Sequence, residues 1–232
     1  MTTLPDPRYE RKFVADALAL GEVLALVRRH PAAFGEAYPA RSVNNLYLDS
    51  PDLRDYHDHV NGVAHRTKTR IRWYGAGSGR IDSPVLQRKL KRGLVSGKLS
   101  HALPPISIKG SVSKPDLEAA FDRANLPGLT RSALHHLLPS LLNLYQRHYF
   151  QSADHRFRLT VDSSLRFAAA RQTDGAGISF GAAASMIVIE LKFGLAEADA
   201  APEVTNALPF RLARCSKYVL GIDSLSRTGD RI

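Results

Sequence analysis

The chain has 232 residues, of which 44% are hydrophobic, so it can bury a core as a folded domain and is not a disordered tail. Its 32 lysines and arginines outnumber its 22 acidic residues, and the resulting net charge of +10 predicts an anionic partner: nucleic acid, an acidic membrane face or a phosphorylated small molecule. The single cysteine, Cys215, excludes an internal disulfide and is typical of a reducing compartment.

The sequence contains no stretch that approaches the roughly 20 apolar residues of a membrane-spanning helix. Residues 1–9 also lack the apolar core of a signal peptide. We therefore expect a cytoplasmic chain without a transmembrane segment. We expect it to bind a membrane only through a partner.

The expected elements alternate between strands and short helices along the whole chain. In the first half we expect strands at 9–14, 42–49, 65–74, 84–91 and 93–101, helices at 16–30, 51–60, 113–124 and 130–138, and a proline-rich loop at 103–109. In the second half we expect strands at 142–151, 155–162, 164–169 and 186–193, a flexible glycine- and alanine-rich loop at 171–185, a short helix at 202–208 and a compact closing element at 214–222. Strands spread in this way predict an α+β fold: a single domain, 1–232, forming one closed antiparallel β-barrel with helices packed outside.

Charged side chains recur with a period of two on several of these strands. In 65–74, Arg66, Lys68, Arg70 and Arg72 share one face, opposite Ile71 and Trp73. Because successive side chains of a strand point to opposite faces, such a strand has one cationic and one apolar side. The other strands of this kind carry Gln87, Lys89 and Lys91; Arg156, Arg158, Thr160 and Asp162; and Val188, Glu190 and Lys192.

A solvated sheet face gives the same alternation, but it ordinarily mixes both signs of charge. Here the faces are cationic, and the opposite faces are apolar enough to pack under helices. Several cationic faces that converge repel one another unless an anion or water lies between them. The pattern therefore predicts a barrel that encloses a polyanion.

Two Glu-x-Lys pairs add a second kind of chemistry. Glu10 and Lys12 share a face of the first strand, and Glu190 and Lys192 share a face of a late one. A carboxylate in this position can bind a hard cation such as Mg²⁺ or Mn²⁺, while the adjacent lysine binds a phosphate oxygen.

An ordered set of short motifs runs from about residue 8 to residue 223. It comprises Tyr9-Glu10-Arg11-Lys12-Phe13, Asn45-Leu46-Tyr47-Leu48-Asp49, Thr69-Arg70-Ile71-Arg72-Trp73-Tyr74-Gly75, Arg158-Leu159-Thr160-Val161-Asp162, Ile189-Glu190-Leu191-Lys192 and Ser216-Lys217-Tyr218. This set resembles the vacuolar transporter chaperone (VTC) domain, a polyphosphate polymerase family among the triphosphate tunnel metalloenzymes.

The resemblance implies a metal-dependent polymerase, using Mn²⁺ or Mg²⁺, that transfers the γ-phosphoryl group of ATP to a polyphosphate chain held in a basic tunnel. The phosphate-binding set that it implies is Lys12, Arg70, Arg72, Lys89, Lys98, Arg147, Arg158 and Lys217. The catalytic residues that it implies are Arg70, Arg72, Lys192 and Lys217. Glu190, with Glu10, is the implied metal ligand.

The chain departs from the family pattern on the fourth strand, where Gln87-Arg88-Lys89 stands in place of Glu-x-Lys, so one potential carboxylate is neutral. It also lacks the phosphate-sensing and membrane regions of eukaryotic relatives, and we therefore do not expect this chain alone to translocate its product.

Several alternatives remain open. If water attacks instead of the growing chain, the protein is an inorganic tripolyphosphatase. If catalysis has been lost, it is an inactive paralogue or a module that binds polyphosphate or RNA. We expect no specific nucleic acid partner, because RNP-type aromatic pairs, helix-turn-helix and zinc-knuckle patterns are missing. Thiamine triphosphatases and adenylate cyclases of this fold carry a fuller Glu-x-Glu-x-Lys opening, whereas Arg8 stands at its first position here. The sequence leaves the oligomeric state open.

Overall fold

The computed structural model describes residues 6–108, 112–170 and 178–228. The strands are β1 (Arg8–Ala15), β2 (Gly35–Asp49), β3 (His65–Tyr74), β4 (Gly79–Ile81), β5 (Val85–Arg92), β6 (Val95–Ala102), β7 (Ile106–Ile108), β8 (Leu138–Gln151), β9 (Phe157–Ala169), β10 (Ile187–Gly194) and β11 (Arg211–Leu212). The α-helices are α1 (Leu20–Arg28), α2 (Arg54–Val60), α3 (Lys114–Arg123), α4 (Gly128–Leu134), α5 (Ala201–Asn206) and α6 (Lys217–Thr228).

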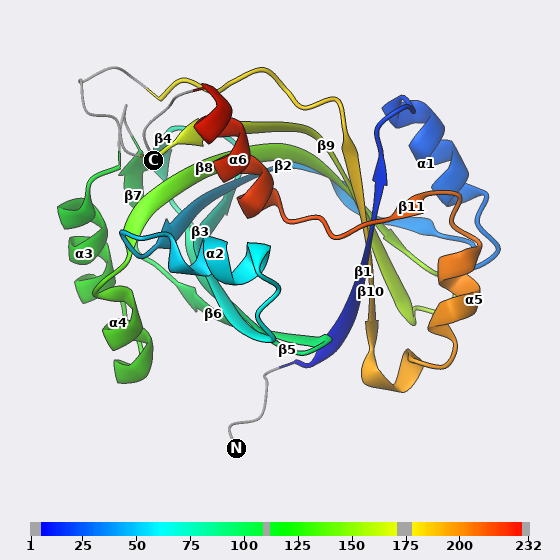
Figure 1. The fold of residues 1–232 in the computed structure, drawn as a ribbon, viewed down its shortest axis with the longest axis horizontal. Helices are drawn as coiled ribbons and strands as arrows, with labels where there is room; N and C mark the ends of the chain where they lie inside the picture. The colour runs from blue at the N-terminus through cyan, green and yellow to red at the C-terminus, as the bar shows by residue number, and fades with distance from the viewer. Residues whose placement is uncertain (1–5, 109–111, 171–177, 229–232) are drawn as a thin grey trace.

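Eight long strands form a ring. Their order is β10-β9-β8-β2-β3-β5-β6-β1, neighbours are antiparallel, and β1 pairs again with β10 (Figure 1). The β1–β10 ladder runs from Arg8 opposite Gly194 to Ala15 opposite Ile187. Within the described residues β1 meets β6 only at Arg8 opposite Ser96. The predicted closed antiparallel fold is therefore confirmed. The ring closes between β1 and β6 through a single pair of opposed residues among those described.

Most of the expected elements are present, β4 and β11 are additional short strands, and β8 begins at Leu138 where the end of a helix was expected. The strand expected at 42–49 begins at Gly35, and Ile106–Ile108 of the expected proline-rich loop pairs with β4. The strands expected at 155–162 and 164–169 form the single strand β9. The element expected at 214–222 is the helix α6, which continues to Thr228. Of the loop expected at 171–185, residues 171–177 lie outside the described part of the chain, and Ala184 forms a bridge to Leu165.

Two apolar clusters cover the outside of the ring. On one side α1 and α5 pack with the outer faces of β1, β9 and β10, burying Val23, Val27 and Ile189 (Figure 1). On the other side α3 packs with the outer faces of β3 and β5, where Trp73 is 1% exposed beside Phe121. These apolar sides oppose the cationic faces of the same strands, so the cationic faces point into the ring.

The third cluster lies inside the ring. Tyr218 and Ile222 of α6 pack against Val14 and Val188, which share strand faces with the inward-pointing residues of β1 and β10. Val188 has no exposed surface. Helix α6 therefore lies across one end of the ring, as Figure 1 shows, and its apolar side chains pack inside that end.

Asp49, at the end of β2, joins the two helices at this end. Its side-chain oxygens accept hydrogen bonds from the backbone N–H groups of Asp55 and Tyr56, at 2.9 and 3.0 Å, and from the Tyr218 hydroxyl at 2.6 Å. The Tyr56 hydroxyl donates to Asp223 of α6 at 2.7 Å. Asp49 thereby satisfies the first free N–H groups of α2, as a helix cap does, and fixes α6 to the same point.

We expect Gly221→Ala to destabilise the fold, because α6 packs closely at this position. A methyl group on Gly221 would lie 2.4 Å from Leu141 Cδ2 and 2.6 Å from Phe167 Cδ1. Such overpacking costs roughly 1–3 kcal/mol, against a gain of at most about 1 kcal/mol in helix propensity. The free energy of unfolding, measured with denaturant, should fall. Gly21→Ala is the matched control, because Gly21 lies in α1 with no atom within 4 Å of its added methyl group.

Candidate functional site

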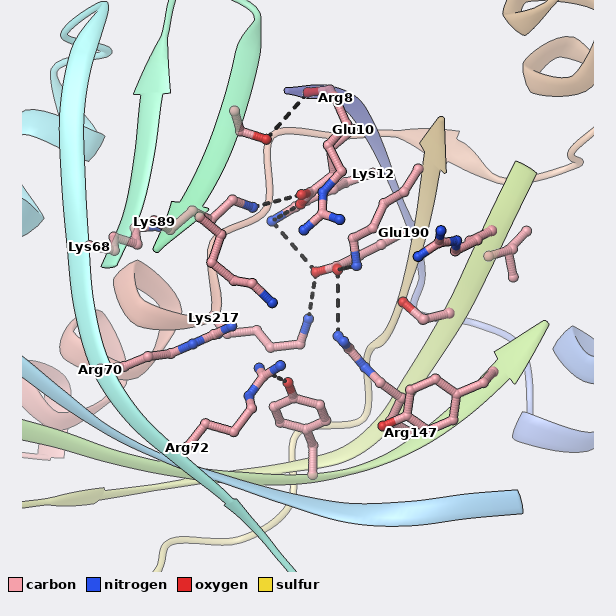
Figure 2. Close-up of a pocket in the computed structure, with 18 of the residues that line it drawn as sticks. Arg8, Glu10, Lys12, Lys68, Arg70, Arg72, Lys89, Arg147, Glu190 and Lys217 are labelled. Carbon is pink, nitrogen blue, oxygen red and sulfur yellow. Dashed lines mark hydrogen bonds and ion pairs between the residues drawn. The ribbon is translucent and has the colours of Figure 1, made fainter. Parts of the chain in front are cut away.

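The ring encloses a cavity of about 630 Å³. Every residue that the sequence suggested for the site lines this cavity, and Figure 2 shows many of these side chains pointing into one space. They come from seven different strands and from the start of α6: Glu10 and Lys12 (β1), Arg70 and Arg72 (β3), Lys89 (β5), Lys98 (β6), Arg147 (β8), Arg158 (β9), Glu190 and Lys192 (β10) and Lys217 (α6).

Two further cations line the cavity that were not predicted as site residues. Lys68 precedes Arg70 on the inward face of β3, and Arg8 precedes Glu10 on that of β1. The period of two along both strands was the signal that could have found them. Tyr145 and Tyr149 of β8 also line the cavity.

Glu10 is a buried carboxylate held between two lysines. Its oxygens lie 2.6 Å from Lys89 Nζ and 3.3 Å from Lys12 Nζ. Burial alone would raise the pKa of Glu10, but these two ammonium groups outweigh it and hold the pKa well below its usual value. Glu10 therefore stays ionised.

Glu190 is surrounded by four cations. Its oxygens lie 2.8 Å from Lys192 Nζ, 3.0 Å from Lys217 Nζ, 3.4 Å from Arg147 Nη2 and 3.6 Å from Lys12 Nζ. Burial would raise the pKa of Glu190, yet the surrounding cations lower it well below its usual value. The Lys12 ammonium is shared by Glu10 and Glu190, and these carboxylates outweigh burial and raise its pKa.

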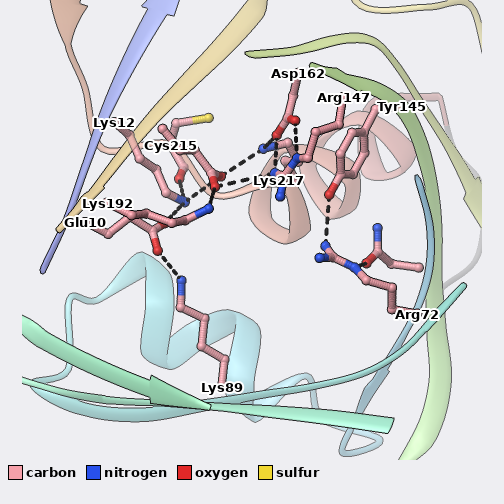
Figure 3. Close-up of polar contacts among 12 residues, drawn as sticks. Glu10, Lys12, Arg72, Lys89, Tyr145, Arg147, Asp162, Lys192, Cys215 and Lys217 are labelled. Atoms are coloured by element: carbon pink, nitrogen blue, oxygen red, sulfur yellow. Dashed lines mark hydrogen bonds and ion pairs between the residues drawn. The ribbon is translucent and has the colours of Figure 1, made fainter. Parts of the chain in front are cut away.

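Asp162 is a third carboxylate behind the cavity wall, and the sequence analysis gave it no role in the site. It is fully buried and accepts two hydrogen bonds from the Arg147 guanidinium, at 2.5 and 2.6 Å. Lys217 Nζ lies 2.5 Å from the same carboxylate, and Figure 3 shows both cations reaching it. The alternation along β9 predicts that Asp162 points inward with the charged residues of that strand. Its two partners belong to β8 and α6, so no local sequence pattern predicts the ion pairs.

Two further cations of the cavity, Arg72 and Lys68, are held by neutral groups. Arg72 donates to Asn45 Oδ1 and to the Tyr145 hydroxyl, both at 2.9 Å, and Lys68 donates to the Ser216 hydroxyl at 2.6 Å. Burial lowers the pKa of Arg72, and burial together with Lys12 and Lys89 lowers that of Lys68 to well below its usual value. The lining of the cavity also contains more cations than carboxylates.

Gln87, the neutral residue in place of a carboxylate, has a positioning role. Its Oε1 accepts hydrogen bonds from Arg70 Nε at 3.1 Å and Nη2 at 2.8 Å. The guanidinium is thus oriented without being neutralised, so its charge remains available to an anion.

The protein supplies only part of the coordination shell of a divalent cation. Among the described residues, no group of three or more His, Cys, Asp or Glu side chains is placed to hold a metal. Glu10 and Glu190 both contact the Lys12 ammonium and offer hard carboxylate oxygens. Mg²⁺ is commonly held by one or two carboxylates together with substrate phosphates, so this donor set fits a metal that binds with a phosphate ligand.

The VTC domain model matches residues 7–226. The chain therefore belongs to the VTC domain family. Its fold is similar to that of a protein from Pyrococcus horikoshii OT3, with a TM-score of 0.51, 15% identity, and coverage of 94% of this chain and 99% of the other. It is also similar to that of a putative adenylate cyclase from Vibrio parahaemolyticus, with a TM-score of 0.50, 10% identity, and coverage of 92% and 98%. No curated protein matches the chain in sequence.

Both similarities extend over more than nine tenths of this chain and concern its fold. Within the described residues, none of the helices is both long and apolar enough to cross a membrane. His135 and His136 lie on the surface, and Cys215 is a buried free cysteine.

We expect Asp162→Asn to destabilise the protein strongly. The substitution leaves the buried Arg147 and Lys217 without their shared carboxylate, and breaking a buried ion pair by removing one partner costs about 3–5 kcal/mol. The free energy of unfolding, from chemical denaturation, should fall by about that amount. Asp82→Asn is the control: Asp82 pairs with Arg80 on the surface, where the loss should stay below about 1 kcal/mol. An equal, small loss in both variants would contradict the role given to Asp162.

We expect tripolyphosphate binding to take up protons through Lys68. The pKa of this lysine lies well below 10.5 in the empty cavity, and a bound phosphate favours the ammonium form and raises the pKa. Between these two pKa values binding adds a proton, and affinity falls as the pH rises through that window. Calorimetry without metal at pH 8, in buffers of different ionisation enthalpy, should show more proton uptake in the wild-type chain than in Lys68→Met.

The ionisation of tripolyphosphate itself is common to both proteins and cancels in this comparison. Lys114→Met, a change at a lysine of α3 outside the cavity, should behave as the wild type. Equal proton uptake in wild type and Lys68→Met would show that Lys68 is already charged in the empty cavity.

Proposed function

We propose that this VTC domain is a polyphosphate polymerase that transfers the γ-phosphoryl group of ATP to the end of a polyphosphate chain. The observation that carries the proposal is the lining of the enclosed cavity. Among the described residues that line it, the cations are Arg8, Lys12, Lys68, Arg70, Arg72, Lys89, Lys98, Arg147, Arg158, Lys192 and Lys217, and the carboxylates are Glu10 and Glu190 alone.

A linear polyphosphate matches this lining in charge and shape. Each phosphate of the chain carries negative charge on its non-bridging oxygens, and cations that project inward from strands around the ring can contact several successive phosphates. Arginines such as Arg72 suit two-point contacts with phosphate oxygens, whereas lysines act as point charges. Membership of the VTC family supports the same substrate.

In the proposed reaction a terminal phosphate oxygen of the chain attacks the γ-phosphorus of ATP. A new P–O bond forms, the bond between the γ-phosphorus and the β,γ-bridging oxygen breaks, and ADP leaves with that oxygen. The chain is then one phosphate longer. Phosphoryl transfer of this kind depends on positioning and charge neutralisation, so no protein nucleophile is required.

The protein contributes fixed cations whose positions its own carboxylates determine. Lys192 and Lys217 are held by Glu190, and Arg147 is held by Asp162. Arg70 and Arg72, oriented by Gln87 and Asn45, supply the contacts that stabilise the charge developing during transfer. A divalent cation such as Mn²⁺ or Mg²⁺, held by Glu190 and Glu10 together with the phosphates, would supply further charge neutralisation.

The purified protein incubated with ATP and Mn²⁺, with and without a short polyphosphate primer, should produce polymer on a gel. Arg72→Ala should lower polymer synthesis by about 100-fold or more and also weaken tripolyphosphate binding, because a direct phosphate contact is lost. Glu190→Gln should lower synthesis to a similar extent and destabilise the empty protein, because its four cations lose their carboxylate. Metal-free tripolyphosphate should still bind, since its negative charge replaces the charge of the lost carboxylate. Arg80→Ala, an exposed arginine paired with Asp82, should behave as the wild type.

Two outcomes would contradict the polymerase proposal. Release of free phosphate from ATP or tripolyphosphate without polymer would identify a triphosphate hydrolase, in which water replaces the chain as attacking group. Tight tripolyphosphate binding with neither polymer nor phosphate released would identify a binding module.

A further inference from the structure

Three tyrosines from three strands meet at one end of the cavity. Tyr38 of β2, Tyr74 of β3 and Tyr149 of β8 all line it, together with the cations. Tyr38 and Tyr149 are in edge-to-face contact, with ring centroids 5.9 Å apart. Tyr38 is 60% exposed and Tyr74 is 51% exposed, so both rings present large surfaces to solvent. We call Tyr38, Tyr74 and Tyr149 the tyrosine rim.

Arg41 of β2 lies at the centre of this rim. Its guanidinium carbon is 5.7 Å from the Tyr38 ring centroid, 5.8 Å from that of Tyr74 and 5.9 Å from that of Tyr149. Within the described residues Arg41 makes no ion pair with a carboxylate. The tyrosine rim and Arg41 therefore form a cluster of π-faces with one planar cation, which suits an aromatic, electron-rich ligand.

The rim continues the phosphate-binding faces of two strands. On β3 the inward residues run Lys68, Arg70, Arg72 and then Tyr74. On β8, Arg147 is followed two residues later by Tyr149. Cations thus give way to aromatic rings in a step of two residues, or roughly 6–7 Å along each strand. A nucleoside triphosphate has the same order of groups, with charged phosphates at one end and an aromatic base at the other.

The opposite end of the cavity differs in character. There the lining includes Lys68, Lys89, Ser216 and Lys217, and α6 fills the end of the ring with apolar side chains. Tyr47, which also lines the cavity, is 5% exposed and stacks on Tyr218 with ring centroids 4.8 Å apart. Its ring is therefore already packed against the protein, whereas Tyr38 and Tyr74 of the rim are open.

We propose that the tyrosine rim and Arg41 bind the base of the nucleoside triphosphate donor, so that the donor enters base-outward with its phosphates among the cations. This inference rests on the proposed function only in taking a nucleoside triphosphate as the donor. The base would stack on a rim tyrosine or on the Arg41 guanidinium, contacts that accept any base because each base has a π-face. The rim would then favour nucleotides over inorganic polyphosphates without selecting strongly among bases.

Binding of a non-hydrolysable ATP analogue and of methyl triphosphate, measured by calorimetry with Mg²⁺, tests the proposal. Both ligands are triphosphate monoesters, but only the first has a base. The wild-type chain should bind the ATP analogue about tenfold more tightly, since only this ligand gains a stacking contact for its base. Tyr74→Ala combined with Tyr149→Ala should remove most of this difference and leave the affinity for methyl triphosphate within about twofold. The Phe substitutions at the same positions should retain the preference.

Arg80→Ala again serves as a control outside the cavity, and intact binding of methyl triphosphate shows that the double variant is folded. Equal affinities of the wild-type chain for the two ligands would overturn the proposal even if the double variant does not fold. A parallel loss of both ligands in a folded double variant would also overturn it. Both affinities are measured without turnover, so the two proposals are tested separately. Absence of polymer would contradict the polymerase proposal without affecting the test of base binding by the tyrosine rim. Polymer synthesis together with equal affinities would contradict base binding alone.

Discussion

The cationic cavity depends on Glu190. This buried carboxylate contacts Lys12, Arg147, Lys192 and Lys217, which belong to three strands and one helix. Four cations brought together without it would repel one another in a poorly solvated space. Glu190 and Asp162 supply the negative charge that lets the strands converge, while Glu10 serves the neighbouring lysines in the same way. The carboxylates are few compared with the cations, so the cavity remains strongly positive.

The same ring contains both the apolar cluster around α6 and the charged cavity. Strand alternation and one irregularity in β9 make this possible. Up to Asp162 the even-numbered residues of β9 point inward, toward the cations. Ser164 has φ of 54°, a left-handed conformation, and beyond it the odd-numbered Leu165 and Phe167 join the cluster around α6. The local change in alternation therefore separates the part of the ring that binds charge from the part that α6 closes.

The sequence predicted the ring from the period of two along single strands, and nearly all of the charged lining from that period together with the resemblance to the VTC domain. It did not predict α6 as a helix inside the ring, nor the roles of Asp49 and Asp162. Asp49 joins α2 to Tyr218, and Asp162 joins β8 to α6, so each role depends on chain segments far apart in sequence. Strand periodicity also could not show that Ser164 shifts the alternation, or that Arg41 meets three tyrosines from different strands.

Lys68 illustrates a conflict between stability and activity that this architecture imposes. Its charge is disfavoured in the empty ring by burial and by neighbouring lysines, so a neutral side chain of similar size would make the empty protein more stable. Burial disfavours the charge of Arg72 as well, although its hydrogen bonds to Asn45 and Tyr145 offset part of that cost. Selection for heat resistance in the absence of phosphate would therefore favour the loss of cations that we propose to bind substrate, as expected where function maintains locally unfavourable groups.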